Sequence, residues 1–325
     1  MTHISDGFHR HIDYLRISVT DRCNLRCVYC MPAEGVKSLP HDDVLRYEEI
    51  ATVARAAAAI GISKLRLTGG EPLVRLGLSD LVKMLSQIEG IDDVALTTNG
   101  TLLKKYASEM KNAGLKRVNI SLDSLKKDRY QKITRTGRLD DALEGIAFAN
   151  EIGLNPVKIN MVVIRGINDD EVTDFARLSV EKGWNVRFIE PMPFVDNTSF
   201  SFVPINEIIE RLKVFGDLEP YPSKNGNGPA RYFKIPGSTG TIGFISPMSE
   251  CFCSSCNRLR LTVDGMLRPC LMSDRELDLR SVLRNGGALN DVKECLLQAI
   301  AAKPERHTLV EGQSQKGRAM CQLGG

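Results

Sequence analysis

Hydrophobic and polar positions in the first 190 residues follow two alternating patterns. Short runs with a period of two predict strands, and apolar residues at helical spacing predict the helices between them. We expect strands at 15–20, 64–68, 94–99, 117–123, 157–163 and 186–190, and helices over 43–60, 77–89, 101–113, 138–152 and 169–182. Six βα repeats with short connections predict a parallel sheet covered by helices. Since a closed barrel has eight such units, a partial (β/α)6 barrel or an open doubly wound sheet is expected.

One face of these strands is polar throughout, and it includes the cations Arg16, Arg66, Lys158 and Arg187. Strands buried on both faces of a parallel sheet would instead read as near-continuous apolar runs. Helices lie between the strands, which argues against a half-solvated antiparallel sheet. Buried unpaired cations are costly, so the pattern predicts a barrel with a wet, cationic interior that holds an anionic ligand. Polyphosphate is a natural candidate, because arginine pairs well with its oxygens.

The βα pattern ends near residue 191, where segments rich in Pro, Asn, Ser and Gly indicate loops. Helices at 205–214 and 288–302 and a few strands predict a smaller α+β domain. We therefore divide the chain into a barrel core (1–205), a C-terminal domain (206–310) and a tail (311–325). The tail has no periodic pattern and is expected to be flexible.

Composition excludes several classes of protein. The chain has 325 residues, 42% of them hydrophobic, which is ordinary for a globular protein. A net charge of +3 gives no argument for nucleic acid or an anionic membrane surface. The first residues, MTHISDGFHR, lack the apolar region of a signal peptide, and no apolar run approaches the length of a membrane span. A cytoplasmic location is expected.

The nine cysteines are distributed unevenly, and their odd number argues against a framework of disulfides alone. The segment TDRCNLRCVYCM places Cys23, Cys27 and Cys30 directly after the first strand, where barrel enzymes carry their active sites. Iron–sulfur clusters are commonly held by four thiolates, so three would leave one iron open. A zinc site short of one ligand is the alternative. A catalytic zinc usually draws on histidine, and this segment has none.

The segment LTGGEPLVR follows the second strand. Adjacent glycines let a backbone approach a ligand closely and expose its amide groups. Gly-Gly alone is more often a simple turn. Beside a three-cysteine loop, Gly-Gly-Glu-Pro is a much stronger signal of a binding site.

These two motifs, with Tyr29 before the last cysteine, resemble the radical S-adenosylmethionine (SAM) superfamily. The resemblance implies a [4Fe–4S] cluster at Cys23, Cys27 and Cys30 whose open iron binds the amino and carboxylate groups of SAM. Reduction then cleaves SAM to methionine and a 5′-deoxyadenosyl radical, which abstracts hydrogen from a substrate. The usual fold is a partial (β/α)6 TIM-like barrel, in agreement with the strand pattern.

Further segments resemble the GTP 3′,8-cyclase (MoaA) family of molybdenum cofactor biosynthesis: YLRISVTDRCNLRCVYCMP, RLTGGEPL, CSSCNRLRLT and the terminal Gly-Gly. This resemblance covers essentially the whole chain. It implies a second [4Fe–4S] cluster in the C-terminal domain, held by Cys253, Cys256 and Cys270, with an open iron that contacts the purine of GTP. Cys251 is an extra thiol to which no role is assigned. Cys295 is expected to be a buried apolar residue.

The same resemblance assigns the remaining site residues by position. It implies SAM contacts at Tyr29, Gly70, Ser121 and Met192. It implies GTP contacts at Arg16, Arg66, Thr97, Lys158, Arg258, Leu259 and Arg260. Gly324 and Gly325 are expected to reach into the active site and to be needed for turnover. Cys321 stands where the family usually carries serine, and little consequence is expected; no role is assigned to Arg187.

The implied reaction converts GTP to (8S)-3′,8-cyclo-7,8-dihydroguanosine 5′-triphosphate. The resemblance also implies a homodimer, an electron donor, and transfer of the product to cyclic pyranopterin monophosphate synthase. One alternative is a radical SAM peptide maturase, although those enzymes typically have more C-terminal cysteines. The other is a zinc-binding structural or nucleic-acid-binding module, which would contain zinc without labile sulfide.

Overall fold

The six predicted strands form a parallel sheet at the centre of the protein. The computed structural model describes residues 4–194, 200–222, 228–307 and 318–324. Each strand lies within two residues of its predicted bounds, and neighbours in the chain are neighbours in the sheet. They are β1 (Tyr14–Ser18), β2 (Lys64–Thr68), β3 (Asp93–Thr98), β4 (Arg117–Ser121), β5 (Lys158–Val162) and β6 (Asn185–Ile189). This sequential order confirms the partial barrel, because a doubly wound sheet reverses its strand order.

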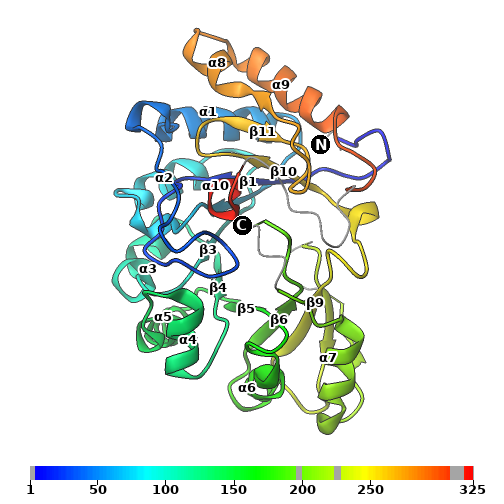
Figure 1. Ribbon diagram of the computed structural model, residues 1–325. Coiled ribbons are helices and arrows are strands. Elements are labelled where there is room, and N and C mark those ends of the chain that lie inside the picture. The colour runs from blue at the N-terminus through cyan, green and yellow to red at the C-terminus, as the bar shows by residue number, and fades with distance from the viewer. Residues whose placement is uncertain (1–3, 195–199, 223–227, 308–317, 325) are drawn as a thin grey trace.

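Helices cover the outer face of this curved sheet (Figure 1). Five of them confirm the predicted pattern: α1 (Tyr47–Ala59), α2 (Leu78–Ser86), α3 (Leu103–Asn112), α5 (Leu139–Glu151) and α6 (Val172–Glu181). Helix α4 (Lys127–Thr134) was missed, because its sequence KDRYQKIT is mostly polar and buries few side chains. The apolar phase of the strands packs against the helices in one hydrophobic cluster, which includes the fully buried Leu15, Ile17 and Leu65.

The C-terminal segment extends both edges of the barrel sheet. Strand β10 (Arg258–Leu261) pairs in parallel with β1, and β9 (Thr241–Ile245) pairs in parallel with β6. Antiparallel strands continue outward from each: β11 (Met266–Arg268) and β12 (Leu277–Asp278) beyond β10, β8 (Arg231–Lys234) and β7 (Glu219–Pro220) beyond β9. The connection between β9 and β10 therefore joins opposite edges of the sheet. The smaller domain that the sequence predicted is thus built onto the core.

The remaining helices are α7 (Ile205–Leu212), α8 (Leu279–Arg284), α9 (Leu289–Ala301) and α10 (Met320–Leu323). Helices α7 and α9 were predicted. Helix α9 packs on α1, next to the edge to which β10 is added. Helix α10 lies inside the arc of strands, where the chain ends (Figure 1). Residues 311–317 of the predicted flexible tail lie outside the described residues, but 318–324 are folded against the barrel. No helix in the described ranges is both long and apolar enough to span a membrane.

Candidate active site

Three cysteine thiols gather on the loop that follows β1. Cys23, Cys27 and Cys30 are each half-buried, and the N–H of Cys30 donates to the carbonyl of Cys27 at 2.9 Å. The turn brings the thiols close enough to interact electrostatically. Burial raises the pKa of Cys23 to about 11 and raises that of Cys27 as well. Because a thiophilic metal displaces such protons, this donor set fits a metal centre with three protein ligands.

The Gly-Gly-Glu-Pro loop after β2 is fastened to this cysteine loop. The N–H groups of Gly70 and Glu71 donate to the carbonyls of Thr20 and Arg22 at 2.7 and 2.8 Å. A Cβ on Gly69 would lie 2.4 Å from the Thr20 oxygen, and one on Gly70 would lie 2.3 Å from the Arg22 oxygen. Only glycine allows the two backbones to approach so closely. The two glycines therefore fix the loops that follow β1 and β2 against each other.

Glu71 ties the same loop to the end of β3. Its buried carboxylate accepts hydrogen bonds from the Thr98 hydroxyl at 2.7 Å and from the N–H groups of Asn99 at 2.7 Å and Leu73 at 3.0 Å. Burial raises the pKa of Glu71 to about 7, although these hydrogen bonds act in the opposite direction. Glu71 thus positions the loop, a role that the sequence reading did not assign to it.

Tyr29 is oriented by a carboxylate at the end of β4. Its hydroxyl donates to Oδ2 of Asp123 at 2.7 Å, and Oδ1 of Asp123 accepts from the N–H of Val162 at 2.8 Å. Burial raises the pKa of Asp123 to about 6 against the effect of both hydrogen bonds. The aromatic residue between the second and third cysteines is thereby held by the barrel wall.

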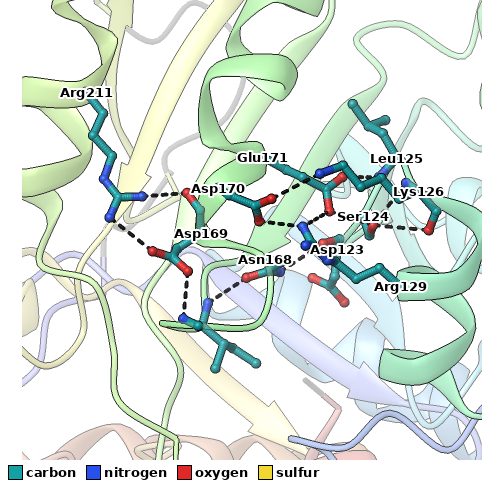
Figure 2. A network of polar contacts seen from close by, with 12 residues as sticks. Asp123, Ser124, Leu125, Lys126, Arg129, Asn168, Asp169, Asp170, Glu171 and Arg211 are labelled. Carbon is teal, nitrogen blue, oxygen red and sulfur yellow. Dashed lines mark hydrogen bonds and ion pairs between the residues drawn. The ribbon is translucent and has the colours of Figure 1, made fainter.

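A network of hydrogen bonds and ion pairs links Asp123 and Ser124 to the residues before α6 (Figure 2). The side-chain amide of Asn168 donates to the Asp123 carbonyl at 2.8 Å. The carboxylate of Glu171, which has no exposed surface, accepts from the Ser124 hydroxyl at 2.8 Å and pairs with Arg129 at 2.7 Å. These contacts fix the loop after β4 to the segment before α6. The position of Tyr29 therefore depends on residues far from the cysteines in sequence.

A cavity of about 270 Å³ lies on the polar face of the strands. Most of the site residues that the sequence predicted line it, and they come from both ends of the chain. They are Arg16, Tyr29, Arg66, Thr97, Ser121, Met192, Cys253, Cys256, Arg258, Arg260 and Cys270.

Three arginines stand level with one another on adjacent strands of this cavity. Strand pairing places Arg16 opposite Arg260 on one side and opposite Arg66 on the other. Burial and the neighbouring charges of Arg260 and Arg66 lower the pKa of Arg16 well below its usual range. Burial, and then Arg258, lower the pKa of Arg260 to about 9. Such a row of mutually repelling cations is stabilised by an anion, which agrees with the expected polyphosphate ligand.

Three predicted contact residues do not line the cavity. Gly70 lies in the Gly-Gly-Glu-Pro loop after β2, where it packs against the backbone of Arg22. The side chain of Leu259 is fully buried in the apolar core, because it points to the opposite face of β10 from Arg258 and Arg260. Lys158 is buried beside the cavity, with Nζ 3.4 Å from the hydroxyl of Tyr232. Burial, followed by Arg187, lowers the pKa of Lys158 to about 6.

The second cysteine group comes from two loops: Cys253 and Cys256 lie between β9 and β10, and Cys270 follows β11. Cys253, Cys256 and Cys270 line the same cavity as Tyr29, whereas Cys251 is exposed. Burial would raise the pKa of Cys256, but Arg258 and Lys303 outweigh it and lower that pKa to about 6. A thiol held as thiolate by two cations is a prepared metal ligand. Cys251 and Cys253 also lie with His307 in a group whose donor atoms are within 4.8 Å of one another.

The structure adds cavity residues that the sequence reading did not assign. Arg187, Asn160, Lys303 and His307 all line the cavity. Arg187 Nε and Asn160 Oδ1 are buried and have no hydrogen-bond partner among the described residues. Arg187 shares the polar strand phase, so the pattern contained this signal. Lys303 and His307 follow α9 and carried no periodic signal.

The C-terminal tail lies inside the barrel, where Gly324 contacts β1 and β2. The carbonyl of Gly324 accepts a hydrogen bond from Arg16 Nη2 at 2.9 Å. Gly324 has φ +74°, and a Cβ there would lie 2.2 Å from Oγ1 of Thr68. The last glycine, Gly325, lies outside the described residues. Gly324 thus contacts Arg16, which lines the cavity, and its role in turnover stays a prediction.

Comparisons with known proteins identify both parts of the chain. Residues 17–179 match the radical SAM superfamily, and residues 184–309 match the family described as Molybdenum Cofactor Synthesis C. A solved structure of Streptococcus suis SuiB bound to S-adenosylmethionine has a TM-score of 0.60 over 96% of this chain and 77% of that one. At 15% sequence identity, this likeness shows the fold alone.

Curated relatives match over the full length. A GTP 3′,8-cyclase of Pelotomaculum thermopropionicum is 53% identical across 99% of this chain and 100% of the relative. One from Moorella thermoacetica is 52% identical with the same coverage. Because these relatives are similar over their whole length, they favour the cyclase interpretation over the peptide maturase and the zinc-binding module. The chain therefore belongs to the radical SAM superfamily and, within it, to the GTP 3′,8-cyclase family.

Proposed function

We propose that this protein is a radical SAM lyase that converts GTP to (8S)-3′,8-cyclo-7,8-dihydroguanosine 5′-triphosphate, the first step of molybdenum cofactor biosynthesis. SAM is cleaved to methionine and 5′-deoxyadenosine in the same reaction. One observation carries the proposal: a row of three arginines lines a cavity that a three-cysteine group also lines, in a chain 53% identical to a GTP 3′,8-cyclase. Such a cavity suits a nucleoside triphosphate.

The family carries two [4Fe–4S] clusters and SAM, and the thiols of this chain fit them. Cys23, Cys27 and Cys30 are the proposed ligands of the SAM-binding cluster. When bound, this cluster and SAM supply the electron and the 5′-deoxyadenosyl group for hydrogen abstraction at the ribose C3′. The protein holds the reacting carbons together and excludes water from the cavity.

Cys253, Cys256 and Cys270 are the proposed ligands of the second cluster, which faces the guanine. Arg258 and Lys303 favour the thiolate of Cys256, and Lys303 is itself fixed by hydrogen bonds to the carbonyls of Arg258 at 2.9 Å and Pro269 at 2.8 Å. A free iron site beside the cavity would orient the base while the arginines hold the phosphates.

The triphosphate is assigned to the cationic wall of the cavity. Arg16, Arg66 and Arg260 offer guanidinium groups at one level, and Arg258 and Thr97 border them. Arg187 joins this set, because its Nε is buried and lacks a described partner. Lys158 is buried beside these arginines, where a bound triphosphate would favour its ammonium form. Leu259 contributes only backbone, since its side chain is in the core.

SAM is assigned to the space between the first cysteine loop and β4. Tyr29, Ser121 and Met192 line the cavity there, and Gly70 shapes the neighbouring loop. Gly324 lies against Arg16 at the inner face of the barrel, and Gly324 and Gly325 are the proposed contributors to turnover. Helix α10, which precedes Gly324, has Cys321 and Leu323 buried, so the tail is held by packing.

We also propose the partners that this chemistry requires. A cytoplasmic electron donor must reduce the first cluster, and cyclic pyranopterin monophosphate synthase must consume the product. A homodimer is proposed from the resemblance alone. Neither nucleic acid nor a membrane is proposed as a partner, in keeping with the small net charge of +3.

The test is anaerobic incubation of the reconstituted protein with SAM and dithionite, with GTP, with ATP, or with no nucleotide. GTP is expected to raise the yield of 5′-deoxyadenosine and to disappear into the cyclised product, whereas ATP is not. Equal yields of 5′-deoxyadenosine with and without GTP would remove the substrate assignment. Zinc without labile sulfide in the purified protein would remove the cluster assignment as well.

A further inference from the structure

A group of three side chains that can bind a metal lies at the edge of the cavity. The thiols of Cys251 and Cys253 and a ring nitrogen of His307 are all within 4.8 Å of one another. Cys253 and His307 line the cavity, whereas Cys251 is exposed. Neither Cys251 nor His307 is a proposed ligand of a cluster. The group therefore combines one thiol of the second trio with two donors that the proposed clusters do not use.

The imidazole of His307 has the hydrogen-bond pattern of a metal ligand. Its Nε2 lies 3.1 Å from the carbonyl oxygen of Pro247. Because a carbonyl oxygen only accepts hydrogen bonds, Nε2 carries the proton and Nδ1 holds the lone pair of the neutral ring. Nδ1 is buried and has no hydrogen-bond partner among the described residues. Metal-binding histidines almost always donate their other ring N–H in this way, and a bound cation would satisfy Nδ1.

A buried arginine joins the two segments that carry these ligands. Arg10 Nη1 donates to the carbonyl of Cys253 at 2.8 Å and to that of Glu305 at 2.9 Å. Arg10 is itself held by an ion pair of 2.6 Å with Asp6, whose side chain has no exposed surface. One guanidinium group thus fixes the cysteine turn against the residues just before His307. The three donors lie together because of these contacts.

Two thiolates and one imidazole suit zinc. A Cys₂His set with an open fourth position is one of the ligand sets that zinc uses, and soft thiolates select against Mg²⁺ and Ca²⁺. Zn–S and Zn–N distances of about 2.3 and 2.0 Å place neighbouring donors roughly 3.5–4 Å apart. The donors observed within 4.8 Å therefore need to approach one another by about 1 Å or less.

We propose that Cys251, Cys253 and His307 bind one Zn²⁺ ion while the second cluster is absent. Two thiol protons pass to solvent as two Zn–S bonds form. The neutral imidazole adds its Nδ1 lone pair and water fills the fourth position, so nothing is oxidised or reduced. Because Cys253 is also a proposed cluster ligand, the ion and the second cluster exclude each other. This exclusion rests on the proposed function, whereas the site itself rests on the geometry of the three donors.

The proposal has two consequences for the cluster-free protein. The exposed thiol of Cys251 gives the ion access from solvent. The ion then occupies one of the three thiols that the second cluster needs, so assembly of that cluster waits for its release. Zinc bound instead by Cys253, Cys256 and Cys270 would not involve Cys251 or His307, and this difference makes the site testable.

The test uses the full-length chain with Cys23→Ala, Cys27→Ala and Cys30→Ala, so that the first trio cannot bind metal. The cluster-free protein is titrated anaerobically with Zn²⁺ in competition with a chromophoric chelator, and one equivalent is expected to bind. Changes beyond the direct ligands of a metal already cost about 10- to 100-fold in affinity. In this background, Cys251→Ser and His307→Gln should therefore each raise the dissociation constant at least about 100-fold.

The matched control is Cys270→Ser in the same background. It removes a thiol of the second trio that is not part of the proposed zinc site, and it should leave the dissociation constant for Zn²⁺ unchanged. Co²⁺ in place of Zn²⁺ reports the donors directly. Its thiolate-to-cobalt absorption should fall by about half in Cys251→Ser, because one of two thiolates is lost, and should persist in Cys270→Ser.

Cluster assembly tests the exclusion. With iron and sulfide alone, the background protein should take up about four irons at the second trio. One equivalent of Zn²⁺ added beforehand should lower this uptake several-fold. Cys251→Ser should restore most of it, since the ion is then held weakly. Equal uptake with and without Zn²⁺ would contradict the exclusion.

The outcomes separate the two proposals. If Cys270→Ser weakens Zn²⁺ binding as much as Cys251→Ser does, zinc uses the cluster trio and the proposed site is wrong. Unchanged affinity in Cys251→Ser would also overturn the site. Failure of the proposed function looks different. The wild type would then incorporate no labile sulfide from iron and sulfide in the absence of zinc, and GTP would not stimulate cleavage of SAM.

Discussion

Arg16 Nη2 donates a hydrogen bond of 2.9 Å to the carbonyl of Gly324, so the first strand of the barrel holds the last described residue of the chain. The same guanidinium belongs to the row of arginines assigned to GTP. The end of the tail and the triphosphate therefore share one cation. This arrangement ties the docking of the tail to the occupancy of the cavity.

Gly324→Ala is expected to undock the tail. Alanine would be strained at φ +74°, and its Cβ would lie 2.2 Å from Thr68 Oγ1. The strain alone costs about 1–2 kcal/mol, which is roughly a tenfold change in the docked population, and the clash adds to it. We expect turnover to fall at least about tenfold, with faster proteolysis near Arg318.

The matched control is Gly237→Ala. Gly237 has φ +77°, but a Cβ there would meet nothing within 4 Å. It reproduces the backbone strain without the clash and should leave turnover near that of the wild type. If both variants lose turnover equally, local strain accounts for the loss and the contact with Thr68 does not.

Arg187→Gln is expected to weaken GTP binding. The Arg187 side chain is buried in the cavity, with Nη2 3.3 Å from Oδ1 of Asn119 and Nε unpartnered among the described residues. A hydrogen bond to a charged group contributes about 1.5–3 kcal/mol, so the dissociation constant should rise about 10- to 100-fold. Calorimetry on the reconstituted protein measures it. Arg177→Gln, at an exposed arginine of α6, should change it little.

GTP binding is expected to weaken as pH rises above 6. The pKa of Lys158 is lowered to about 6, first by burial and then by neighbouring arginines, so above this pH its amine is mostly neutral in the free protein. A triphosphate favours the ammonium form and raises that pKa. GTP therefore binds together with a proton, and its affinity falls by up to about tenfold per pH unit within the window.

Calorimetry in two buffers with different ionisation enthalpies counts the protons taken up with GTP. The terminal phosphate also titrates near pH 6, so the informative quantity is the difference between the wild type and Lys158→Met. The variant should take up fewer protons and show a flatter pH dependence. Identical proton uptake in the two proteins would argue that Lys158 does not respond to the triphosphate.

Removing one cluster at a time should separate SAM cleavage from the response to GTP. Cys23→Ala is expected to lose about four irons and all cleavage of SAM, since the first cluster loses a ligand. Cys256→Ala is also expected to lose about four irons, but it should still cleave SAM slowly and no longer respond to GTP. Iron analysis and 5′-deoxyadenosine yields measure both effects. Normal cleavage of SAM by Cys23→Ala would contradict the assignment of the first trio.

Glu171→Ala is expected to destabilise the support of Tyr29. Arg129 still pairs with Asp170, but the Ser124 hydroxyl and the Leu125 N–H lose their buried acceptor, and a buried group left without its partner typically costs about 1–3 kcal/mol. The unfolding temperature should drop by several degrees. Glu207→Ala breaks an ion pair with Arg165 that is exposed, where such pairs contribute about 0–1 kcal/mol, and it should have little effect. Thermal unfolding of both variants decides the point.

The sequence pattern predicted the barrel well because each strand has one apolar phase and one polar phase. Arg16 and Arg66 could be assigned to the interior by counting alternate positions, and the pairing of β1 with β2 confirms it. The same counting places Leu259 in the opposite phase to Arg258 and Arg260, so its buried side chain was foreseeable. The resemblance to a family had named all three as contacts, without regard to phase.

Other features depend on contacts between distant segments and have no local signal. Helix α4 is too polar for its period to stand out, and its one buried face is fixed by the tertiary structure. Lys303 matters only because the chain after α9 returns to the carbonyls of Arg258 and Pro269. Cys321 looked like a neutral surface replacement, because nothing in the sequence of the tail indicates that this residue is buried.

Because β9 and β10 cover the two edges of the six-stranded sheet, the barrel strands are synthesised before their edges can be paired. Strand β1 is synthesised first, but the strand that pairs with its outer edge, β10, is synthesised much later. The outer edge of β6 likewise stays unpaired until β9 has been synthesised. A nascent chain that stops before β9 therefore displays two unpaired parallel edges, which are templates for misassembly with other strands. The loop that carries the first cysteine trio is likewise synthesised long before β10 covers the edge of β1 beside it.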